Sequence, residues 1–284
     1  MINSLTGCLL INKKVGLTSR QEVNNISHIL KEKKCGHIGT LDPFASGLLI
    51  VLVGNATKIS PFLERENKTY IATLKLGQMT DSGDLDGKVI LEKEVPQLTK
   101  KQIQEALDSF LGKSFQIPPM YSALKKDGKH LYDYARKGIE IERQPREINV
   151  FNIKLISFKQ DEITFEAKVS KGTYIRTLGE DIAKQLNCVG HLVALKRTAI
   201  GEFELSKAID SDNVTEVDLI SIEDMLRSLP TIYLEGREAF KANNGVALKL
   251  DSSADEVILK DEKGIIAVYK KQNSDVYSCL RGFR

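Results

Sequence analysis

The sequence is poor in cysteine and has no long apolar run, and each scarcity excludes a class of protein. The four cysteines, at positions 8, 35, 188 and 279, form no C-x-x-C pair and have no histidine pair nearby, so neither a disulfide framework nor a zinc site is indicated. The longest apolar run, Leu48 to Val53, is far shorter than the roughly 20 residues that cross a bilayer. P-loop, G-x-G-x-x-G and H-E-x-x-H motifs are also absent, which removes the main support for nucleotide and zinc-protease chemistry.

The composition is that of a globular protein. With 284 residues, of which 42% are hydrophobic and 28% charged, the chain can bury a sizeable core and exceeds the usual length of one domain. We expect two domains, at residues 1–230 and 231–284. The apolar stretch near the start, Cys8 to Ile11, is too short for a secretory signal. We therefore expect a cytoplasmic protein with free thiols. We also expect a monomer.

Charge is nearly balanced overall, at +3, but it is unevenly distributed. Residues 113–146 carry eight Lys or Arg against four acids, and residues 168–197 carry six against two, whereas residues 211–230 carry one Arg against five acids. Two basic stretches on one face would attract a polyanion such as nucleic acid. Scattered, solvated lysines explain the charge equally well.

Hydrophobic periodicity predicts a mixed α/β chain. The box Ser19-Arg20-Gln21-Glu22 is expected to open a helix that ends at Cys35-Gly36, and Thr99 to Gln102 is a second capping box. An apolar stripe at 175, 178, 182 and 186 predicts another helix, and an acidic helix is expected over residues 215–227. Strands are predicted at 7–13, 48–53, 68–76, 148–158, 163–169 and 191–199, with short ones at 247–250, 256–259 and 265–269.

These strands follow one another without regular βαβ alternation. The pattern favours an α+β fold around a mixed, largely antiparallel sheet flanked by helices. From about residue 230 onwards, short strands punctuated by glycine predict a small β-rich domain. At about 55 residues such a domain is marginal alone, so we expect it to pack on the larger one.

The stretch GHIGTLDPFASGLL, residues 36–49, is the most informative candidate for chemistry. Pro43 restricts the conformation of Asp42, and the flanking glycines permit tight turns, so a carboxylate is held on a stiffened loop. An Asx-type turn, in which Asp42 bonds its own backbone, is the structural alternative. A second candidate is KGTYIR, residues 171–176. If Arg176 lies near Asp42, its charge favours the ionised carboxylate; otherwise it is a surface arginine.

Two further stretches carry charged or aromatic side chains. The acidic loop GQMTDSGDLDG, residues 77–87, fails as an EF-hand because Lys93 falls where a bidentate Glu is required, so no metal site is indicated. Residues 118–138 interleave three tyrosines with four lysines, one histidine and one arginine. That mixture suits stacking on bases and contact with phosphates, although a hairpin and short helix with core tyrosines would also fit, with a turn at Asp127-Gly128.

Taken in order, these motifs resemble the TruB family of tRNA pseudouridine synthases. The similarity runs from about Gly7 to Gly201 and covers GHIGTLDPFASGLL, KTYIATLKLGQMTDSGDLDG, PPMYSALKKDGKHLYDYARKGIE, SKGTYIRTLGEDI and HLVALKRTAIG. Ile38 and Phe44 stand where other members often have Thr and Leu. The resemblance implies a pseudouridine synthase fold with a short PUA-like C-terminal RNA-binding domain, and an isomerase that acts without a cofactor on the T-loop uridine at tRNA position 55.

The resemblance also implies roles for individual residues. Asp42 is identified as the catalytic aspartate, acting as nucleophile or as base. Tyr70 resembles the tyrosine that stacks on the flipped base, and Arg176 the arginine that pairs with the aspartate. The residues implied in RNA binding are His37, which enters the T-loop, Asp84, which helps to place the substrate, and Lys171 and Tyr174, which belong to the strand of the pocket.

Two other functions remain open on the sequence. One is an RNA-binding module that refolds tRNA and whose catalysis is dispensable. The other is a glycosidase that uses Asp42 and Asp84 as a carboxylate pair, which would hydrolyse the glycosidic bond and release uracil. Its requirement is a defined separation of the two carboxylates.

Overall fold

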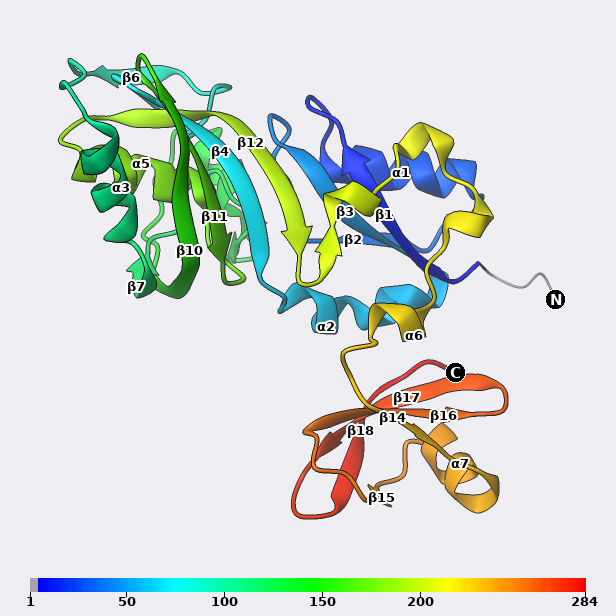
Figure 1. Ribbon diagram of the computed structural model, residues 1–284. Coiled ribbons are helices and arrows are strands. Elements are labelled where there is room, and N and C mark those ends of the chain that lie inside the picture. The colour runs from blue at the N-terminus through cyan, green and yellow to red at the C-terminus, as the bar shows by residue number, and fades with distance from the viewer. Residues whose placement is uncertain (1–4) are drawn as a thin grey trace.

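The computed structural model describes residues 5–284, which form a large α+β unit and a smaller β-rich unit (Figure 1). The large unit is built on a nine-stranded sheet with the order β1-β3-β12-β4-β11-β10-β7, to which β2 and β13 add at β3 and β12. Only the β3–β12 pairing of this sheet is parallel. The predicted mixed, largely antiparallel sheet is therefore confirmed. Its strands are β1 (Gly7–Lys13), β2 (Cys35–Ile38), β3 (Ser46–Val53), β4 (Lys68–Leu76), β7 (Gly112–Gln116), β10 (Arg146–Lys159), β11 (Glu162–Val169), β12 (Gly190–Ile200) and β13 (Phe203–Glu204).

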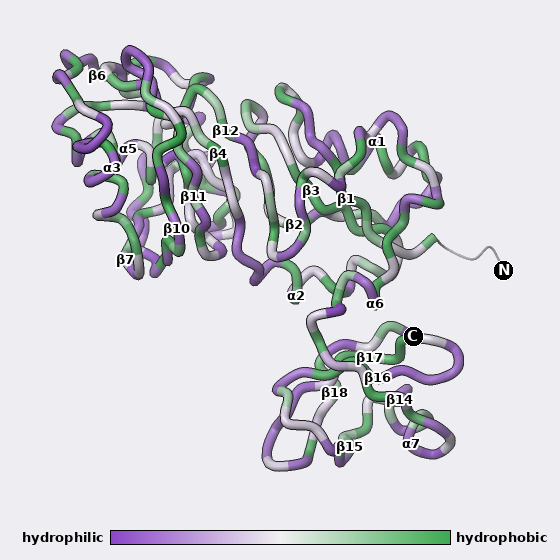
Figure 2. The backbone as a smooth tube through the Cα atoms, viewed as in Figure 1, coloured by the Kyte–Doolittle hydropathy of each residue, from purple (hydrophilic) through white to green (hydrophobic). Residues whose placement is uncertain are grey.

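Helices cover this sheet where its strands are apolar. Alternation of hydrophobic and hydrophilic residues along the strands is visible in Figure 2. Apolar side chains of α3 and α5, including Ile103 and Ile182, pack in one core with Leu74 of β4 and Phe165 of β11. The helices are α1 (Ser19–Ile29), α2 (Ser60–Glu64), α3 (Lys100–Asp108), α4 (Leu131–Ala135), α5 (Ile175–Gln185), α6 (Ile222–Met225) and α7 (Gly236–Asn243). In residues 5–284, none combines the length and apolar character that a membrane crossing requires.

Strand β3 is buried on both faces. One face, with Leu49 and Val51, packs against Val23 and Ile26 of α1. The other face, with Leu48 and Ile50, belongs to a core shared with the C-terminal unit. Because both faces are covered, this strand has a continuous apolar run and no alternation.

Two sequence predictions about helices need correction in position. The first helix is capped by Thr18 rather than Ser19: Thr18 Oγ1 accepts from the Gln21 amide at 3.1 Å, and Gln21 Oε1 accepts from the Thr18 amide at 2.8 Å. Ser19 is drawn away from this box because its hydroxyl bonds the backbone of Leu41. The helix also ends at residue 29 and not at Cys35-Gly36, which lie in β2, paired with β3.

The acidic helix predicted over residues 215–227 is wrong in extent. A 3₁₀ turn at Glu216–Asp218 is followed by α6, which covers only Ile222–Met225. Two hydroxyls each cap a local turn. The Thr215 hydroxyl donates to the Asp218 carboxylate, and the Ser221 hydroxyl donates to the Asp224 carboxylate and accepts from the Asp224 amide. Two competing capping motifs within seven residues break the segment into short pieces. By contrast, the box from Thr99 to Gln102 opens α3 as predicted.

The C-terminal unit is a five-stranded sheet of order β14-β16-β17-β18-β15, with α7 packed against it. It contains three elements that the sequence did not predict, β14, α7 and β18. The strands are β14 (Thr231–Tyr233), β15 (Leu248–Lys249), β16 (Glu256–Asp261), β17 (Gly264–Lys271) and β18 (Val276–Gly282). Its first strand begins next to the expected boundary at residue 230, and the division of the chain into two domains there stays a prediction.

The small unit packs on the large one, as expected from its size. Ile258, Val268 and Phe283 of the C-terminal sheet join the core that holds Ile50 and Phe62. At the edge of this contact, Arg65 forms a double hydrogen bond with the Glu256 carboxylate, at 3.0 and 2.6 Å. The two units therefore share one apolar core.

Truncating this shared core should lower the stability of the protein. Ile258 is fully buried, so Ile258→Ala should reduce the free energy of unfolding by about 2–5 kcal/mol, through lost burial and the cavity left behind. Chemical denaturation measures the change. Val217→Ala is the control, because Val217 is 92% exposed and its truncation should change stability by no more than about 0.5 kcal/mol. Equal effects of the two substitutions would contradict a shared core.

Candidate active site

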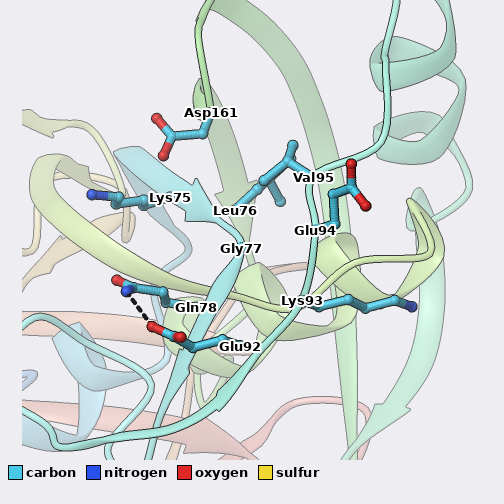
Figure 3. A pocket seen from close by; sticks show the side chains of 9 residues that line it. All are labelled: Lys75, Leu76, Gly77, Gln78, Glu92, Lys93, Glu94, Val95 and Asp161. Carbon is cyan, nitrogen blue, oxygen red and sulfur yellow. Dashed lines mark hydrogen bonds between the residues drawn. The ribbon is translucent and has the colours of Figure 1, made fainter.

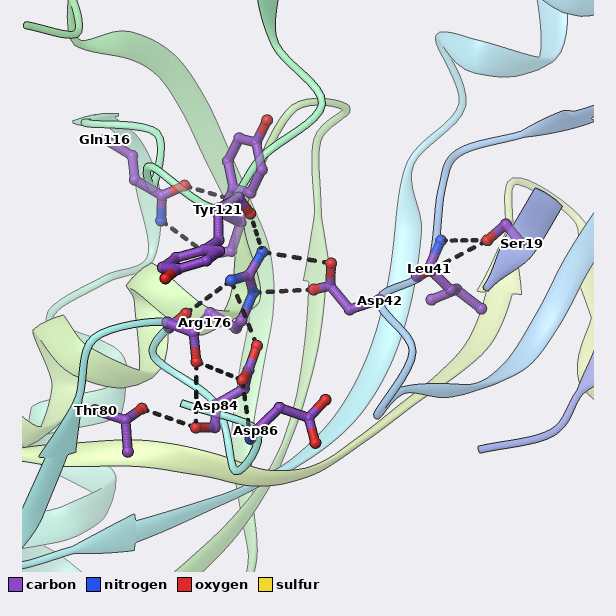
Figure 4. A network of polar contacts seen from close by, with 11 residues as sticks. Ser19, Leu41, Asp42, Thr80, Asp84, Asp86, Gln116, Tyr121 and Arg176 are labelled. Carbon is purple, nitrogen blue, oxygen red and sulfur yellow. Dashed lines mark hydrogen bonds and ion pairs between the residues drawn. The ribbon is translucent and has the colours of Figure 1, made fainter. Parts of the chain in front are cut away.

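Arg176, at the start of α5, is the centre of a polar network (Figure 4). Its Nε lies 2.9 Å from Asp42 Oδ2, and one terminal nitrogen donates to Asp42 Oδ1 at 3.4 Å. The same nitrogen donates to the Tyr121 carbonyl at 2.6 Å, and the other one donates to the Ser82 carbonyl at 2.7 Å and lies 3.4 Å from Asp84 Oδ2. All five N–H donors of the guanidinium thus have partners. The side chain is only 5% exposed, which excludes a surface arginine.

Asp84 lies behind Arg176, away from solvent. Its carboxylate accepts hydrogen bonds from the Ser82 hydroxyl at 2.6 Å and from the Asp86 amide at 3.2 Å, in addition to the contact with Arg176. The Thr80 hydroxyl donates to the Asp84 carbonyl at 2.8 Å. The acidic loop therefore holds one carboxylate against the guanidinium. A carboxylate engaged in this way and 8% exposed is poorly placed to act as the second acid of a glycosidase.

The loop that carries Asp42 is held by its neighbours rather than by its own side chain. Ser19 Oγ accepts from the Leu41 amide at 2.9 Å and donates to the Leu41 carbonyl at 3.1 Å. The Pro43 carbonyl accepts from the Gly16 amide at 2.8 Å, and the Asp42 carbonyl accepts from the Ala45 amide at 3.1 Å. The Asp42 carboxylate itself bonds Arg176, so the Asx-turn alternative is not what the structure contains.

Two opposing effects act on the Asp42 carboxyl. Burial raises its pKa above the ordinary value because the charged form is desolvated. The charge and hydrogen bonds of Arg176 oppose this rise, and the neighbouring charge of Asp84 adds to it. The expected pairing with Arg176 is therefore present, but it offsets the effect of burial only in part.

Six of the seven predicted site residues line one cleft of about 1030 Å³. They are His37, Asp42, Tyr70, Lys171, Tyr174 and Arg176. Segments far apart in the sequence bring them together: β2 carries His37, the β2–β3 loop Asp42, and β4 Tyr70. The seventh, Asp84, reaches the cleft only through Arg176. Among residues 5–284, no three His, Cys, Asp or Glu side chains come together as metal ligands.

Lys171 and Tyr174 lie in the loop between β11 and α5 and not in a strand, which corrects the position expected for them. Gln116, which is buried, holds this loop: its amide nitrogen donates to the Tyr174 carbonyl at 3.1 Å and its oxygen accepts from the Tyr174 amide at 2.8 Å. Glycine with a φ of +83° at position 172 permits the turn. The side-chain amide of Gln116 thus makes the two hydrogen bonds with the Tyr174 backbone that a neighbouring strand would otherwise make, and it holds the loop in place.

Residues 118–145 form a segment, here called the arm, whose Tyr121 carbonyl accepts a hydrogen bond from Arg176. Its hairpin joins β8 (Lys125–Lys126) and β9 (Lys129–His130) through Asp127-Gly128, where both residues have positive φ, as the sequence predicts. The tyrosines at 121, 132 and 134 are partly exposed rather than buried in a core. Tyr132 stacks on His130 and lies 5.4 Å from the Arg136 guanidinium.

Comparison with known proteins gives the family. The profile described as "TruB family pseudouridylate synthase (N terminal domain)" matches residues 27–175, and the profile described as "tRNA pseudouridylate synthase B C-terminal domain" matches residues 176–232. The chain belongs to the TruB family. The tRNA pseudouridine synthase B of Mesoplasma florum is 36% identical over 279 residues, which cover 98% of both chains. That of Francisella philomiragia is 44% identical over 230 residues, 81% of this chain and 75% of the relative.

Solved structures support the fold assignment. "Crystal Structure of a Cbf5-Nop10-Gar1 Complex" contains a chain that superposes with a TM-score of 0.73 at 22% identity, over 99% of this chain and 85% of that one. A chain of "Structure of H/ACA RNP bound to a substrate RNA containing 2'-deoxyuridine" gives a TM-score of 0.72 at 20% identity, over 98% and 85%. Because the superposition covers nearly the whole chain, it includes the small C-terminal sheet, which is PUA-like.

Sequence reasoning missed two buried cations that line the cleft of this TruB family member, Lys68 and Arg197. Lys68 lies two residues before Tyr70 on β4, and Arg197 is opposite Tyr70 in the β4–β12 register. Residues two apart on a strand, and directly opposed residues on neighbouring strands, share a face. The period-two pattern of β4 could therefore have identified Lys68, whereas Arg197 required the strand pairing.

A second hollow, of about 470 Å³, lies at the far end of β4 and holds none of the predicted site residues (Figure 3). Lys75, Gln78 and Glu92 are among its lining residues, and Gln78 Nε2 donates to Glu92 Oε1 at 2.8 Å. It lies at the end of the strand opposite to Lys68. This hollow is separate from the Asp42 cleft.

The pKa of Asp42 predicts a pH-dependent gain of stability in Asp42→Asn. A carboxyl whose pKa is raised by folding favours the folded state only while protonated, so its stabilising contribution is lost as pH rises from the unfolded value through the folded one. Asparagine has no such ionisation. Denaturant unfolding should therefore show Asp42→Asn at least as stable as the wild type at pH 7, with the gain disappearing on acidification below pH ~4. A loss of stability at pH 7 that does not change with pH would contradict this.

Proposed function

We propose that this protein is a tRNA pseudouridine synthase that isomerises the T-loop uridine, at tRNA position 55. The observation that carries the proposal is the Asp42–Arg176 pair at the wall of a cleft that Tyr70 and His37 also line. Membership in a family whose profiles are described as pseudouridylate synthases supports it. Relatives that are 36% and 44% identical, over 98% and 81% of the chain, are named tRNA pseudouridine synthase B.

The reaction requires bond exchange at one sugar carbon. The bond between N1 of uracil and C1′ of the ribose breaks, the uracil turns in the cleft, C5 bonds to C1′, and the proton on C5 moves to N1 by way of a base or water. Product and substrate have the same atoms and the same oxidation state. The chemistry therefore needs no redox partner or phosphoryl donor, and we propose no cofactor.

Asp42 begins the reaction as an ionised carboxylate, either by attack on the nucleoside or by removal of a ribose proton to form a glycal. Both routes require a negative charge close to C1′. Its pairing with the buried Arg176 keeps this charge available at the wall of the cleft, and Asp84 holds Arg176 in position from behind. The partial exposure of Asp42, at 35% of its side chain, leaves it open to the cleft.

The aromatic side chains of the cleft suit a nucleoside pulled out of its stack. Tyr70 offers a ring on which the flipped uracil stacks and a phenol near C5. His37 replaces the extruded base in the T-loop, since base flipping costs a few kcal/mol of lost stacking. Lys171 and Tyr174 contact the same RNA from the β11–α5 loop.

The wider partner is the T-arm and elbow of tRNA. The basic arm at residues 118–145 and the PUA-like C-terminal domain, residues 231–284, extend the binding surface to either side of the cleft. We propose that the protein acts as a monomer in the cytoplasm. Binding through phosphates by this surface would weaken steeply with salt.

Replacing the carboxylate should slow the reaction strongly without preventing RNA binding. Asp42→Asn keeps the shape of the side chain but removes its charge, so pseudouridine formation should fall by about 10²- to 10⁴-fold. The measurement is pseudouridine in the T-loop of an unmodified tRNA transcript after incubation. Lys75→Met, remote from the cleft, should retain wild-type activity. Full conversion by Asp42→Asn would refute the assigned role, and no product from the wild type would refute the function.

The reaction rate should fall as pH falls through the raised pKa of Asp42. Arg176 opposes the rise of that pKa, so Arg176→Lys, which keeps a charge but loses the double contact, should move the acidic limb of kcat to higher pH. Single-turnover rates between pH 4 and 8 measure this limb. An identical limb in the wild type and the variant would show that Arg176 does not set the ionisation of Asp42.

A further inference from the structure

Two cations in the wall of the Asp42 cleft have no acidic partner. Lys68 is 7% and Arg197 1% exposed, and both line the cleft. Within residues 5–284, neither side chain forms an ion pair with a carboxylate at 4.0 Å or less. A buried charge without a counter-ion is costly, so such a pair points to a ligand that supplies the missing charge.

Backbone carbonyls hold both cations in place. Lys68 Nζ donates to the carbonyls of Glu64 and Glu66, at 2.7 and 2.5 Å, and the Glu64 and Glu66 carboxylates act on it only from a distance. Three donors on an ammonium leave one N–H for a further acceptor. Arg197 donates from Nε to the Leu48 carbonyl at 2.7 Å and from a terminal nitrogen to the Gly39 carbonyl at 2.8 Å.

The two cations lie close to each other and to the Asp42 loop. A Cβ added at Gly39 would lie 3.2 Å from an Arg197 terminal nitrogen and 3.9 Å from Lys68 Cε. Burial and the charge of Arg197 lower the pKa of Lys68 to about 8, and Lys171 adds to this. Lys68 is still mostly protonated at pH 7 and would gain by pairing with an anion.

The strand geometry relates this positive site to the base-binding site. The side chains of Lys68 and Tyr70 lie on the same face of β4. Their Cα atoms are about 7 Å apart, because a strand rises about 3.4 Å per residue. If a base stacks on Tyr70, the ribose and phosphate of the same nucleotide would therefore lie within reach of Lys68, two residues away on the same face.

We propose that Lys68 and Arg197 form the phosphate subsite that binds a backbone phosphate of the flipped nucleotide. The inference rests on the proposed function, because it assumes an RNA nucleotide in the cleft, and it names the contact that fixes this nucleotide. The phosphate supplies the counter-charge and the remaining acceptor for Lys68. Arg197 links the subsite to catalysis, since it also holds the Gly39 end of the Asp42 loop.

Lys68→Met is the decisive variant, because it removes the charge but keeps the length of the side chain and leaves Arg197 on the loop. Its affinity for a T-arm stem–loop RNA should fall about 10- to 100-fold, as expected for one charged hydrogen bond. The slope of log K against log salt should decrease by about one. Lys75→Met, a lysine at the other end of the same strand (Figure 3), is the matched control and should keep the wild-type affinity and slope.

A scan of the RNA with single methylphosphonates, which neutralise one phosphate at a time, locates the contact. Neutralising a phosphate of the target nucleotide should weaken wild-type binding. The same change should weaken the binding of Lys68→Met by a smaller factor, because only Arg197 is left to contact that phosphate. The subsite is refuted if no methylphosphonate at the target nucleotide or its neighbours changes the affinity of the wild type. This test does not depend on whether Lys68→Met folds.

The outcomes separate the two proposals. If the wild type converts uridine to pseudouridine while Lys68→Met keeps its salt slope and its sensitivity to every methylphosphonate, the subsite is wrong and the function stands. If the wild type forms no pseudouridine, the function itself fails. Melting curves of both variants establish that they are folded before binding is compared.

Discussion

The ion pair between Asp42 and Arg176 joins residues 134 positions apart and is the contact on which the site depends. The guanidinium also holds the carbonyls of Ser82 and Tyr121 and the Asp84 carboxylate. A single side chain thereby connects the Asp42 loop, the acidic loop and the arm to α5. Since its fork has fixed geometry, moving any one of these segments would disturb the others.

Burial and pairing act in opposite directions at this site. Enclosure by protein raises the pKa of Asp42, while Arg176 opposes the rise. The result is a carboxylate that is less stable, and hence more reactive, than an exposed one. The same principle applies to Lys68 and Arg197, two buried cations whose hydrogen bonds within residues 5–284 go to backbone carbonyl oxygens. The cleft thus contains charged groups of both signs that burial disfavours. The phosphate of a bound nucleotide would stabilise the positive ones.

The scaffold that holds these charges is continuous. Strand β3 leads away from the Asp42 loop and is buried between α1 and the core that the C-terminal sheet shares. Glu64, the last residue of α2, and Glu66 in the following turn contribute the carbonyls that hold Lys68. Arg65, between them, binds Glu256 of the C-terminal sheet. The C-terminal unit therefore packs against the turn that holds Lys68, in addition to the RNA-binding role proposed for it.

Local elements could be predicted from the sequence wherever short-range physics decides them. Alternation of apolar and polar residues predicted β4, and apolar residues at helical spacing predicted α5. The Asp127-Gly128 turn followed because both residues tolerate a positive φ. Where two local motifs competed, as at the Thr18 and Ser19 caps, the tertiary bond from Ser19 to Leu41 made the choice. The segment at residues 215–227 is instead broken by local competition alone, between the capping hydroxyls of Thr215 and Ser221.

The candidate site divides in a similar way. Asp42, Tyr70 and Arg176 could be selected because the ordered motifs resemble those of a family, and the structure places all three in one cleft. The position of Asp84 behind Arg176, and the presence of Lys68 and Arg197, could not be read from spacing. Periodicity reports which face of a strand a residue occupies, but which charges meet depends on how strands distant in the sequence are paired, and only the folded chain decides that.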